Sequence, residues 1–340
     1  MPPGYPSHLV ALDPLLACPG GVVSVRGVRL LAENGDAPQV NVGPLPAHVV
    51  SASNVRVSFR VPPTADGGLT PVRISTVAGE SLMLDVGRTL ATGIHLVDSP
   101  VFDASGRLYV TVSGARGQQA PVSVFRVDAA GQREPFASGI VNATSMAFGP
   151  DSLLYVTSRF EGVVYRVSEG GEVAPVVTEL GVACGLAFAP DGTMFVGDRS
   201  GTLFRARPGE QPSVVATLPP SVAAYHLAVG GDGWIYVSIQ TLSSRDHVYR
   251  VSTAGVVEIL HSGFGRPQGL AFDAHGHLHV VEALAGASGV YRLDEGRAPT
   301  LVGAGEGLVG VTFAPDGALV AASNEAVFGF SRNAAIANTH

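Results

Sequence analysis

A unit of two apolar runs joined by a turn recurs along most of the chain, and this repetition restricts the possible folds more than any other feature. The clearest copy is Cys184-Gly-Leu-Ala-Phe-Ala-Pro-Asp-Gly-Thr-Met-Phe-Val-Gly-Asp198. Two apolar runs on either side of an Ala-Pro-Asp-Gly turn predict two antiparallel strands joined by a tight hairpin. The six copies, 40 to 46 residues apart, are anchored at Ser99, Ser145, Gly185, His226, Gly269 and Gly310.

Each copy continues into further strands. A third strand carries an aromatic residue in the first five copies, as in Val164-Tyr-Arg-Val167, and a weaker fourth strand follows, as in Glu134–Ser138. Four antiparallel strands repeated about every 40 residues predict a β-propeller, because one such sheet cannot bury both faces alone. The sixth copy lacks a fourth strand, and we expect Arg88–Gly93 to supply it. The sequence therefore predicts a six-bladed β-propeller over residues 86–330, closed by a strand at about 86–93.

The first 85 residues follow another rhythm, with seven short strand-like runs separated by turns. The runs are Leu9–Leu12, Gly21–Leu30, Gln39–Val42, His48–Ser51, Val55–Val61, Thr70–Val77 and Leu82–Val86. Seven short alternating strands favour an immunoglobulin-like β-sandwich. The predicted fold class is thus all-β, a β-sandwich over residues 1–85 plus the propeller, with a polar tail at 331–340.

Composition and charge exclude several classes of partner. The chain of 340 residues is 46% hydrophobic and 14% charged, with 43 Gly and 24 Pro, which suits short strands and many turns. Nucleic acid is not an expected partner, because the net charge is −7 and the 21 Lys and Arg form no basic run. No apolar stretch is long enough to span a membrane, and no signal peptide is visible. We expect a cytoplasmic protein with a small-molecule substrate; a trimmed leader stays an alternative, and the oligomeric state stays open.

The N-terminal segment resembles the IPT/TIG family of immunoglobulin-like domains. The resemblance rests on Pro19-Gly-Gly-Val-Val-Ser-Val-Arg-Gly27, Val40-Asn-Val-Gly43 and Val57-Ser-Phe-Arg-Val-Pro62, and it covers nearly all of residues 1–85. Some members of that family bind DNA, whereas in bacterial multidomain chains the domain is more often a spacer or docking module. With no basic patch here, we favour the spacer.

The repeats resemble the NHL-repeat and gluconolactonase-like superfamily. The stretch from Gly185 to Asp198 matches its hairpin pattern Gly-Leu-Ala-Phe-x-Pro-Asp-Gly-x-Leu-Tyr-Val-x-Asp almost throughout, and the resemblance spans residues 86–330. It implies the propeller fold. It does not fix the activity, because propellers host hydrolases, lyases, oxidoreductases and binding platforms.

Candidate site residues lie where the loop before the first strand and the loop after the second strand of each blade meet, which we call the mouth face. We predict His226, Glu282 and Asp98 as the catalytic core, because a histidine beside a carboxylate can act as a general base. The other candidates, expected to bind substrate, are Tyr225, Arg159, Arg199, Gln268 and Asn324. The alternative for His226 is a packed, hydrogen-bonded core histidine.

A divalent cation, most plausibly Ca²⁺, is the one cofactor that the pattern suggests, and no organic cofactor is indicated. Asp98, Asp198 and Glu282 come from the first, third and fifth blades, and three carboxylates around one axis can hold a hard cation. Asp98-Ser-Pro-Val-Phe102 is similar to the family's Glu-Gly-Pro-x-Trp motif, whose Glu binds the metal. Other positions depart from the family, since Thr144, Cys184 and Tyr225 stand where it has Asn or Asp. Asp198 as a loop cap is the alternative.

These features predict a small-molecule enzyme with its site at the propeller mouth. The reaction classes that suit the candidate residues are hydrolysis of a lactone or ester and proton abstraction by a lyase, with possible metal assistance left open. The alternative is a non-catalytic platform in which loops 239–246 and 283–289 hold a protein or glycan. A third reading is a structural protein with a blocked mouth.

Overall fold

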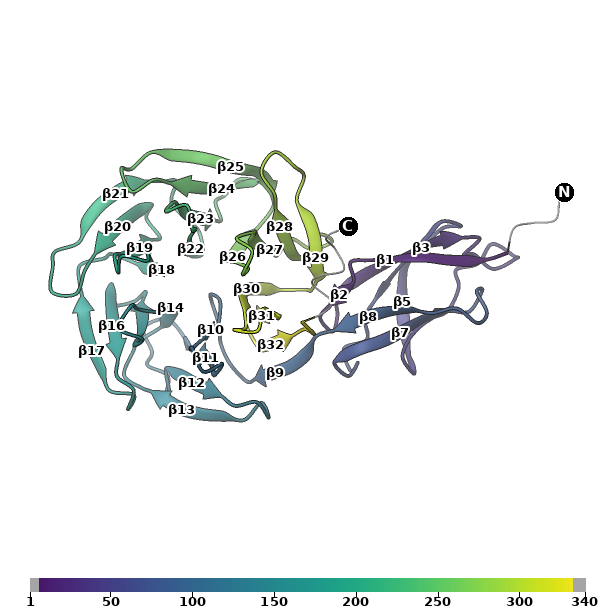
Figure 1. Ribbon diagram of the computed structural model, residues 1–340, viewed down its shortest axis with the longest axis horizontal. Helices are drawn as coiled ribbons and strands as arrows, with labels where there is room; N and C mark the ends of the chain where they lie inside the picture. Colours follow the sequence, from purple (N-terminus) through teal and green to yellow (C-terminus); the bar gives the residue numbers. More distant parts are fainter. Residues whose placement is uncertain (1–5, 333–340) are drawn as a thin grey trace.

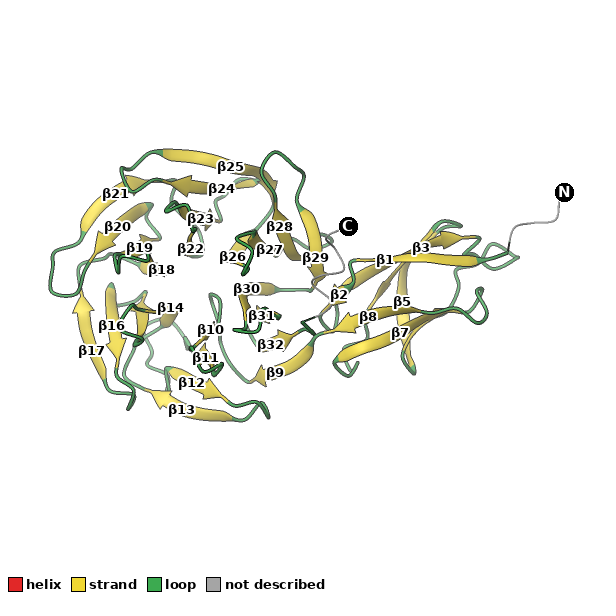
Figure 2. Ribbon diagram, in the orientation of Figure 1, coloured by secondary structure: helices red, strands yellow, loops and turns green. Residues whose placement is uncertain are grey.

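The chain is built of strands and loops throughout the part that the structure describes. The computed structural model describes residues 6–332, and no helix occurs among them (Figure 2). Among these residues, accordingly, no helix is long and apolar enough to cross a membrane. The tail predicted at 331–340 lies outside the described residues from position 333 onward.

Strands β9 to β32 form a ring of six four-stranded blades (Figure 1). Blade one contains β10 (Val101–Phe102), β11 (Leu108–Thr111), β12 (Val124–Val127) and β13 (Arg133–Ala137). Blade two contains β14 (Ala143–Phe148), β15 (Leu154–Ser158), β16 (Val163–Val167) and β17 (Val173–Val177). Blade three contains β18 (Ala183–Phe188), β19 (Met194–Asp198), β20 (Thr202–Ala206) and β21 (Ser213–Thr217). Blade four contains β22 (Tyr225–Val229), β23 (Ile235–Ile239), β24 (Asp246–Val251) and β25 (Val257–Phe264). Blade five contains β26 (Pro267–Phe272), β27 (Leu278–Glu282), β28 (Gly289–Leu293) and β29 (Thr300–Ala304). Blade six contains β30 (Leu308–Phe313), β31 (Leu319–Ser323), β32 (Ala326–Gly329) and β9 (Arg88–Thr92). The propeller prediction is confirmed.

The turn between the first two strands of each blade is held by an aspartate. Each carboxylate accepts the backbone amide two residues further on, an arrangement that stabilises such turns; the six are Asp103, Asp151, Asp191, Asp232, Asp273 and Asp316. In three blades a tyrosine of the second strand also donates its hydroxyl to this aspartate: Tyr109, Tyr155 and Tyr236. The repeated Pro-Asp-Gly and Leu-Tyr-Val motifs thus build one side of the ring, which we call the hairpin face.

Neighbouring blades share buried apolar clusters, so no blade is stable alone. Each of the six contacts between consecutive blades has its own cluster, including the contact of blade six with blade one, where Val320 and Val327 pack with Leu108 and Val110. Burying a side chain of this size contributes about 1.5–3 kcal/mol. The ring is therefore stabilised blade against blade.

The ring closes through β9. This strand pairs antiparallel with β32, with Val327 opposite Ala91 and Gly329 opposite Arg88, and so supplies the outermost strand of blade six. The closing strand predicted at about 86–93 is confirmed. Because the last blade draws strands from both ends of the ring, no sheet edge is left open at the closure.

The strands before β9 form a separate group beside the ring (Figure 1). They are β1 (His8–Asp13), β2 (Leu16–Ala17), β3 (Val22–Val28), β4 (Val40–Val42), β5 (Leu45–Ala52), β6 (Arg56–Arg60), β7 (Gly68–Ile74) and β8 (Leu82–Val86), and their apolar side chains share one buried cluster. Seven of the eight overlap the runs predicted from the sequence, while β2 was not predicted. The pairings alone establish an all-β group, and its immunoglobulin-like kinship stays a prediction.

The N-terminal strands are joined to the ring by hydrogen bonds as well as by the chain. β2 lies between β8 and β29 and runs parallel to both, so that one continuous sheet passes from the N-terminal strands into blade five. Leu16 of β2 belongs to the cluster between blades five and six. Arg60 and Glu306 form an ion pair across the same junction. Shared pairing and shared core make this junction a firm attachment.

Candidate functional site

The inner strands of blades five, six and one approach one another closely at their anchor residues. A Cβ atom on Gly310 would lie 2.5 Å from the Cα of Ser99, and one on Gly269 would lie 2.7 Å from the Ser99 side-chain oxygen. Only glycine tolerates such close approach. The Ser99 hydroxyl also accepts the amide of Val311 from blade six. The small anchor residues thus let the inner strands meet near the axis.

His226 and Asp98 bond to each other close to these anchor residues. His226 lies on β22 of blade four and Asp98 precedes β10 of blade one, and Figure 1 labels these strands on opposite sides of the ring's centre. His226 Nδ1 lies 2.8 Å from Asp98 Oδ1, and that oxygen also accepts the amide of Ser99 at 2.7 Å. Both side chains are buried, with His226 at 0% exposure. The structure thus brings together two of the three residues predicted as the catalytic core.

The second ring nitrogen of His226 has no partner. Nε2 is buried and makes no hydrogen bond within the described residues. An ionised carboxylate only accepts hydrogen bonds, so Nδ1 is the donor toward Asp98 and Nε2 is the ring nitrogen left for another partner. Leaving a buried nitrogen without a partner is costly, so Nε2 is available to a ligand that reaches it.

A cavity of about 360 Å³ fills the channel on the hairpin side of this pair. Its walls are the last residues of the six inner strands, mostly apolar side chains such as Phe102, Phe148, Phe188 and Phe272, and Asp98 is the one charged residue among them. None of the other predicted site residues lines it. The cavity and the predicted mouth therefore lie on opposite sides of the His226–Asp98 pair.

Glu282 has a different set of partners from the one predicted. It ends β27, and its carboxylate accepts the amides of Gly265, Arg266 and Leu284 at 2.6, 2.8 and 2.7 Å. Two of these amides belong to the loop before β26 and the third to the loop after β27, and no hydrogen bond joins Glu282 to His226 among the described residues. These contacts make Glu282 a loop cap, and its catalytic role stays a prediction.

Asp198 caps its loop in the same way. Its Oδ1 accepts the amide of Val182 at 2.8 Å, and its Oδ2 accepts the hydroxyl of Ser200. Among residues 6–332 no group of three or more His, Cys, Asp or Glu could hold a metal ion. The predicted cation site of Asp98, Asp198 and Glu282 is therefore not assembled among these residues, since two of the three carboxylates are turned to backbone amides.

The predicted substrate-binding residues divide into buried and open positions. Tyr225 is fully buried in the cluster between blades three and four, and its hydroxyl donates to the Pro219 carbonyl, so its place is in the core. Gln268 is half-buried on β26, and Asn324 is exposed beyond β31. Arg159 and Arg199 are half-buried directly after β15 and β19. The open positions all lie on the mouth face.

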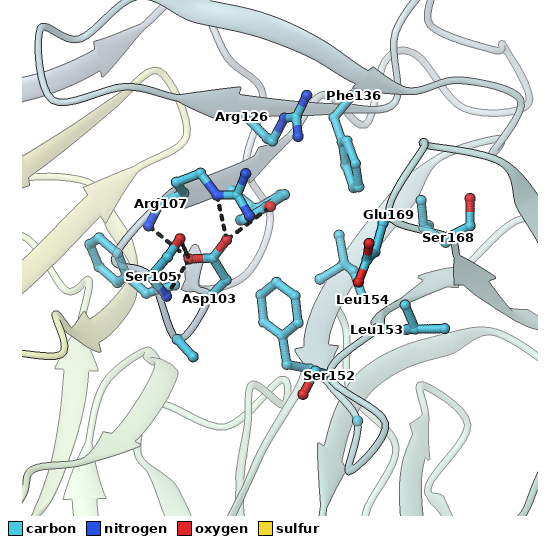
Figure 3. A pocket seen from close by; sticks show the side chains of 16 residues that line it. Asp103, Ser105, Arg107, Arg126, Phe136, Ser152, Leu153, Leu154, Ser168 and Glu169 are labelled. Carbon is cyan, nitrogen blue, oxygen red and sulfur yellow. Dashed lines mark hydrogen bonds and ion pairs between the residues drawn. The ribbon is translucent and has the colours of Figure 1, made fainter.

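A groove of the hairpin face contains an aspartate and an arginine that pair with each other. Between blades one and two a cavity of about 490 Å³ is lined by Asp103, Arg107 and Phe136 (Figure 3). The Asp103 carboxylate accepts bonds from Ser105, the Arg107 amide and the Arg107 guanidinium, which the dashed lines of Figure 3 mark. This groove is a product of the turn geometry that every blade shares. Its Asp103 and Arg107 charges are thus paired with each other.

The fold defines an all-β propeller of the six-bladed type. No protein-family model matches the chain, and no curated protein does. Among solved structures, an auxiliary nutrient binding protein from Bacteroides ovatus is similar at 12% identity and a TM-score of 0.55, over 96% of this chain and 98% of that one. A candidate gluconolactonase is similar at 19% identity and a TM-score of 0.55, over 72% and 91% of the two chains. Virginiamycin B lyase from Staphylococcus aureus is similar at 11% identity and a TM-score of 0.52, over 91% and 98%. Likeness at such identities establishes the fold alone.

Proposed function

We propose that the protein is a small-molecule enzyme in which His226, held by Asp98, acts as the general base. The observation that carries the proposal is the buried, unpartnered Nε2 of a histidine whose Nδ1 is fixed by a carboxylate at 2.8 Å. The reaction classes that such a base serves are hydrolysis of a lactone or ester and elimination after proton abstraction. Solved structures of similar fold are named for both chemistries, a candidate gluconolactonase and a lyase.

The chemistry of the pair follows from its charge. Asp98 fixes the tautomer that leaves the Nε2 lone pair free, and its negative charge stabilises the imidazolium that forms when Nε2 takes a proton. The proton comes from the attacking water in hydrolysis or from a carbon next to a carbonyl in elimination. Nε2 is buried, so a substrate reaches it only after side chains around it move apart. We place the substrate on the mouth face, where Arg159, Arg199, Gln268 and Asn324 are open.

The test is turnover of a lactone and carboxylate-ester panel by the wild type, His226→Gln and Asp98→Asn. We expect His226→Gln to lower kcat about 1,000-fold, because a positioned general base contributes roughly 10²–10⁴-fold. Asp98→Asn should lower kcat less and shift its pH profile, since the imidazole loses its carboxylate partner. His261→Gln, on the outer strand β25, is the matched control and should leave turnover unchanged.

Two outcomes would count against this assignment. One is undiminished turnover in folded His226→Gln, with folding judged from its melting curve. The other is loss of turnover in His261→Gln to the same extent, which would mean that any histidine substitution damages the protein. Turnover should also be unchanged by a chelator, because the proposal includes no metal.

A second candidate function is a binding platform for a glycan or protein, and two observations favour it. The nutrient binding protein is similar over 96% of this chain, so the likeness includes the N-terminal strands. Large apolar side chains also stand exposed on mouth-face loops, Leu242 at 94%, Phe160 at 54% and Leu284 at 45%. A platform would bind its partner equally well after His226→Gln, which separates the two candidates. In either case we propose residues 1–85 as an immunoglobulin-like spacer.

A further inference from the structure

Three arginines from successive blades gather on the mouth face. Arg159 and Arg199 directly follow the second strands of blades two and three, and Arg116 lies in the loop after β11, the second strand of blade one. In a propeller the loops after the second strands all open on one face, so these three residues occupy adjacent sectors of it. We call them the arginine arc. Arg116 was not among the residues predicted from the sequence, because its loop is longer than the corresponding loops of the other blades.

The loop that carries Arg116 is fixed against the neighbouring blade. Asn142, at the start of blade two, donates to the carbonyls of Ser113 and Ala115 at 2.6 and 2.8 Å and accepts the amide of Gly117 at 2.7 Å. A Cβ atom on Gly117 would lie 3.0 Å from the ring of Phe160, the residue next to Arg159. The loops of Arg116 and Arg159 therefore touch, and the first is pinned on both sides of its arginine.

The charges of the arc have no internal counter-charge. No hydrogen bond or ion pair within residues 6–332 involves the guanidinium groups of Arg116, Arg159 or Arg199, whereas Arg107, Arg126, Arg250 and Arg292 all pair with carboxylates. The carboxylate nearest along the chain, Asp198, is taken by Val182 and Ser200. Guanidinium groups gathered without a direct carboxylate partner are suited to an anion.

The environment between the arginines is partly buried. Burial lowers the pKa of Arg159, Cys184 opposes this effect, and the charges of Arg199 and Arg116 lower the pKa further. Cys184 lies close to Arg159 and Arg199, and burial raises the pKa of its thiol to about 11, so it stays uncharged. The Cys184 sulfur accepts the amide of Tyr225, which precedes His226. The arc therefore borders the strand that carries the proposed base.

We propose that the arginine arc binds the anionic group, a carboxylate or phosphate, of a small molecule at the propeller mouth. The inference deepens the proposed function, because it makes the substrate an anion whose charged group is held beside β22. Arg159 and Arg199, half-buried, form the principal contacts. Arg116 closes the site from the pinned loop.

The experiment measures anion binding directly, apart from any turnover. Wild type, Arg159→Gln, Arg199→Gln and Arg116→Gln are titrated calorimetrically with inorganic phosphate and with citrate at low ionic strength, where charge contacts are least screened. We expect binding by the wild type, about tenfold weaker binding after either half-buried arginine is replaced, and a smaller loss for Arg116→Gln. Arg205→Gln, on β20 of blade three, removes the same charge away from the mouth and should bind like the wild type.

The outcomes distinguish the site from general electrostatics and from the proposed base. Equal weakening in Arg205→Gln and Arg159→Gln, or no binding of either anion by the wild type, would overturn the arc. If Arg159→Gln does not fold, Arg159→Lys keeps the charge without the two-pronged geometry and should still bind more weakly than the wild type. His226→Gln should bind both anions as the wild type does, because the arginine arc does not include His226. Anion binding therefore tests the arc even if His226 proves not to be the general base.

Discussion

Gly310→Ala should destabilise the protein by about 3 kcal/mol, although it adds one methyl group. The new Cβ would lie 2.5 Å from the Cα and 2.9 Å from the amide nitrogen of Ser99, and both are backbone atoms. Backbone cannot move aside as a flexible side chain can, and overpacking of this kind costs about 1–3 kcal/mol. The substitution forces blade six away from blade one, where the ring closes. The measurement is thermal unfolding, with Tm expected to fall by roughly 6–12 °C.

Gly231→Ala is the matched control for that substitution. Gly231 lies in the turn of blade four, has an ordinary φ and has no atom within 4 Å of the added Cβ. Its replacement should leave stability unchanged or raise it slightly, because alanine restricts the unfolded chain. An unchanged Tm for Gly310→Ala would mean that the two blades separate without cost, which contradicts a ring sealed at this seam. The same shift should also disturb Asp98, whose carbonyl lies 3.0 Å from the added atom.

The propeller could be predicted from the sequence because the same short motifs recur in each blade. Asp191 and its counterparts hold the turn, Tyr155 and its counterparts hold the aspartate, and the apolar runs between them form the contacts between blades. Repetition turns six weak hairpin signals into one strong prediction. The closing strand followed from counting, because five copies carried a fourth strand and the sixth did not. β2 was missed because two residues carry no periodicity, and its pairing with β29 depends on tertiary contact.

The candidate site was predictable only where a residue broke the repeat. His226 stands where the other copies have glycine or serine, and the structure gives this side chain a partner across the axis. Glu282 and Asp198 were chosen for their charge at the end of a second strand. Whether such a carboxylate faces the channel or its own loop depends on which amides lie within reach, and in both cases these come from the loop before the blade and from the loop after the second strand. Residue type and position cannot distinguish the two orientations.

In the proposed anion site, one residue was missed by the sequence analysis, namely Arg116. Arg159 and Arg199 were recognised by their equal offset from the second strand, whereas Arg116 lies in a longer loop that has no counterpart. Asn142 brings that loop into place through three hydrogen bonds to Ser113, Ala115 and Gly117. Asn142 has a φ of 51°, and neither this backbone conformation nor its three hydrogen bonds could be predicted from the sequence. Irregular loops position functional side chains through such long-range contacts, and a repeat alignment omits them.

His279→Tyr should make the protein markedly more stable in mild acid. His279 occupies the position of Tyr109, Tyr155 and Tyr236 in their blades, is 4% exposed and packs edge-on against Phe313. Burial lowers its pKa from 6.5 to about 4, outweighing the opposing effect of Asp273, while the nearby charge of Arg292 lowers it further. As pH falls below 6.5 the unfolded chain takes up this proton first, so stability present above pH 6.5 is lost progressively toward pH 4. The loss approaches about 3 kcal/mol.

Tyrosine removes that loss, because a phenol has no proton to gain in this range and can donate to Asp273 as its counterparts donate to Asp103, Asp151 and Asp232. Urea unfolding at pH 8, 6 and 4.5 measures the effect, and the variant's advantage should be near zero at pH 8 and grow to roughly 2–3 kcal/mol at pH 4.5. His48→Tyr, on exposed β5, controls for losing one imidazole and should track the wild type. A constant advantage at every pH would mean that packing and not protonation separates the two proteins. An equal increase in the free energy of unfolding of both variants at pH 4.5 would mean that protonation of His279 does not cause the loss of stability in acid.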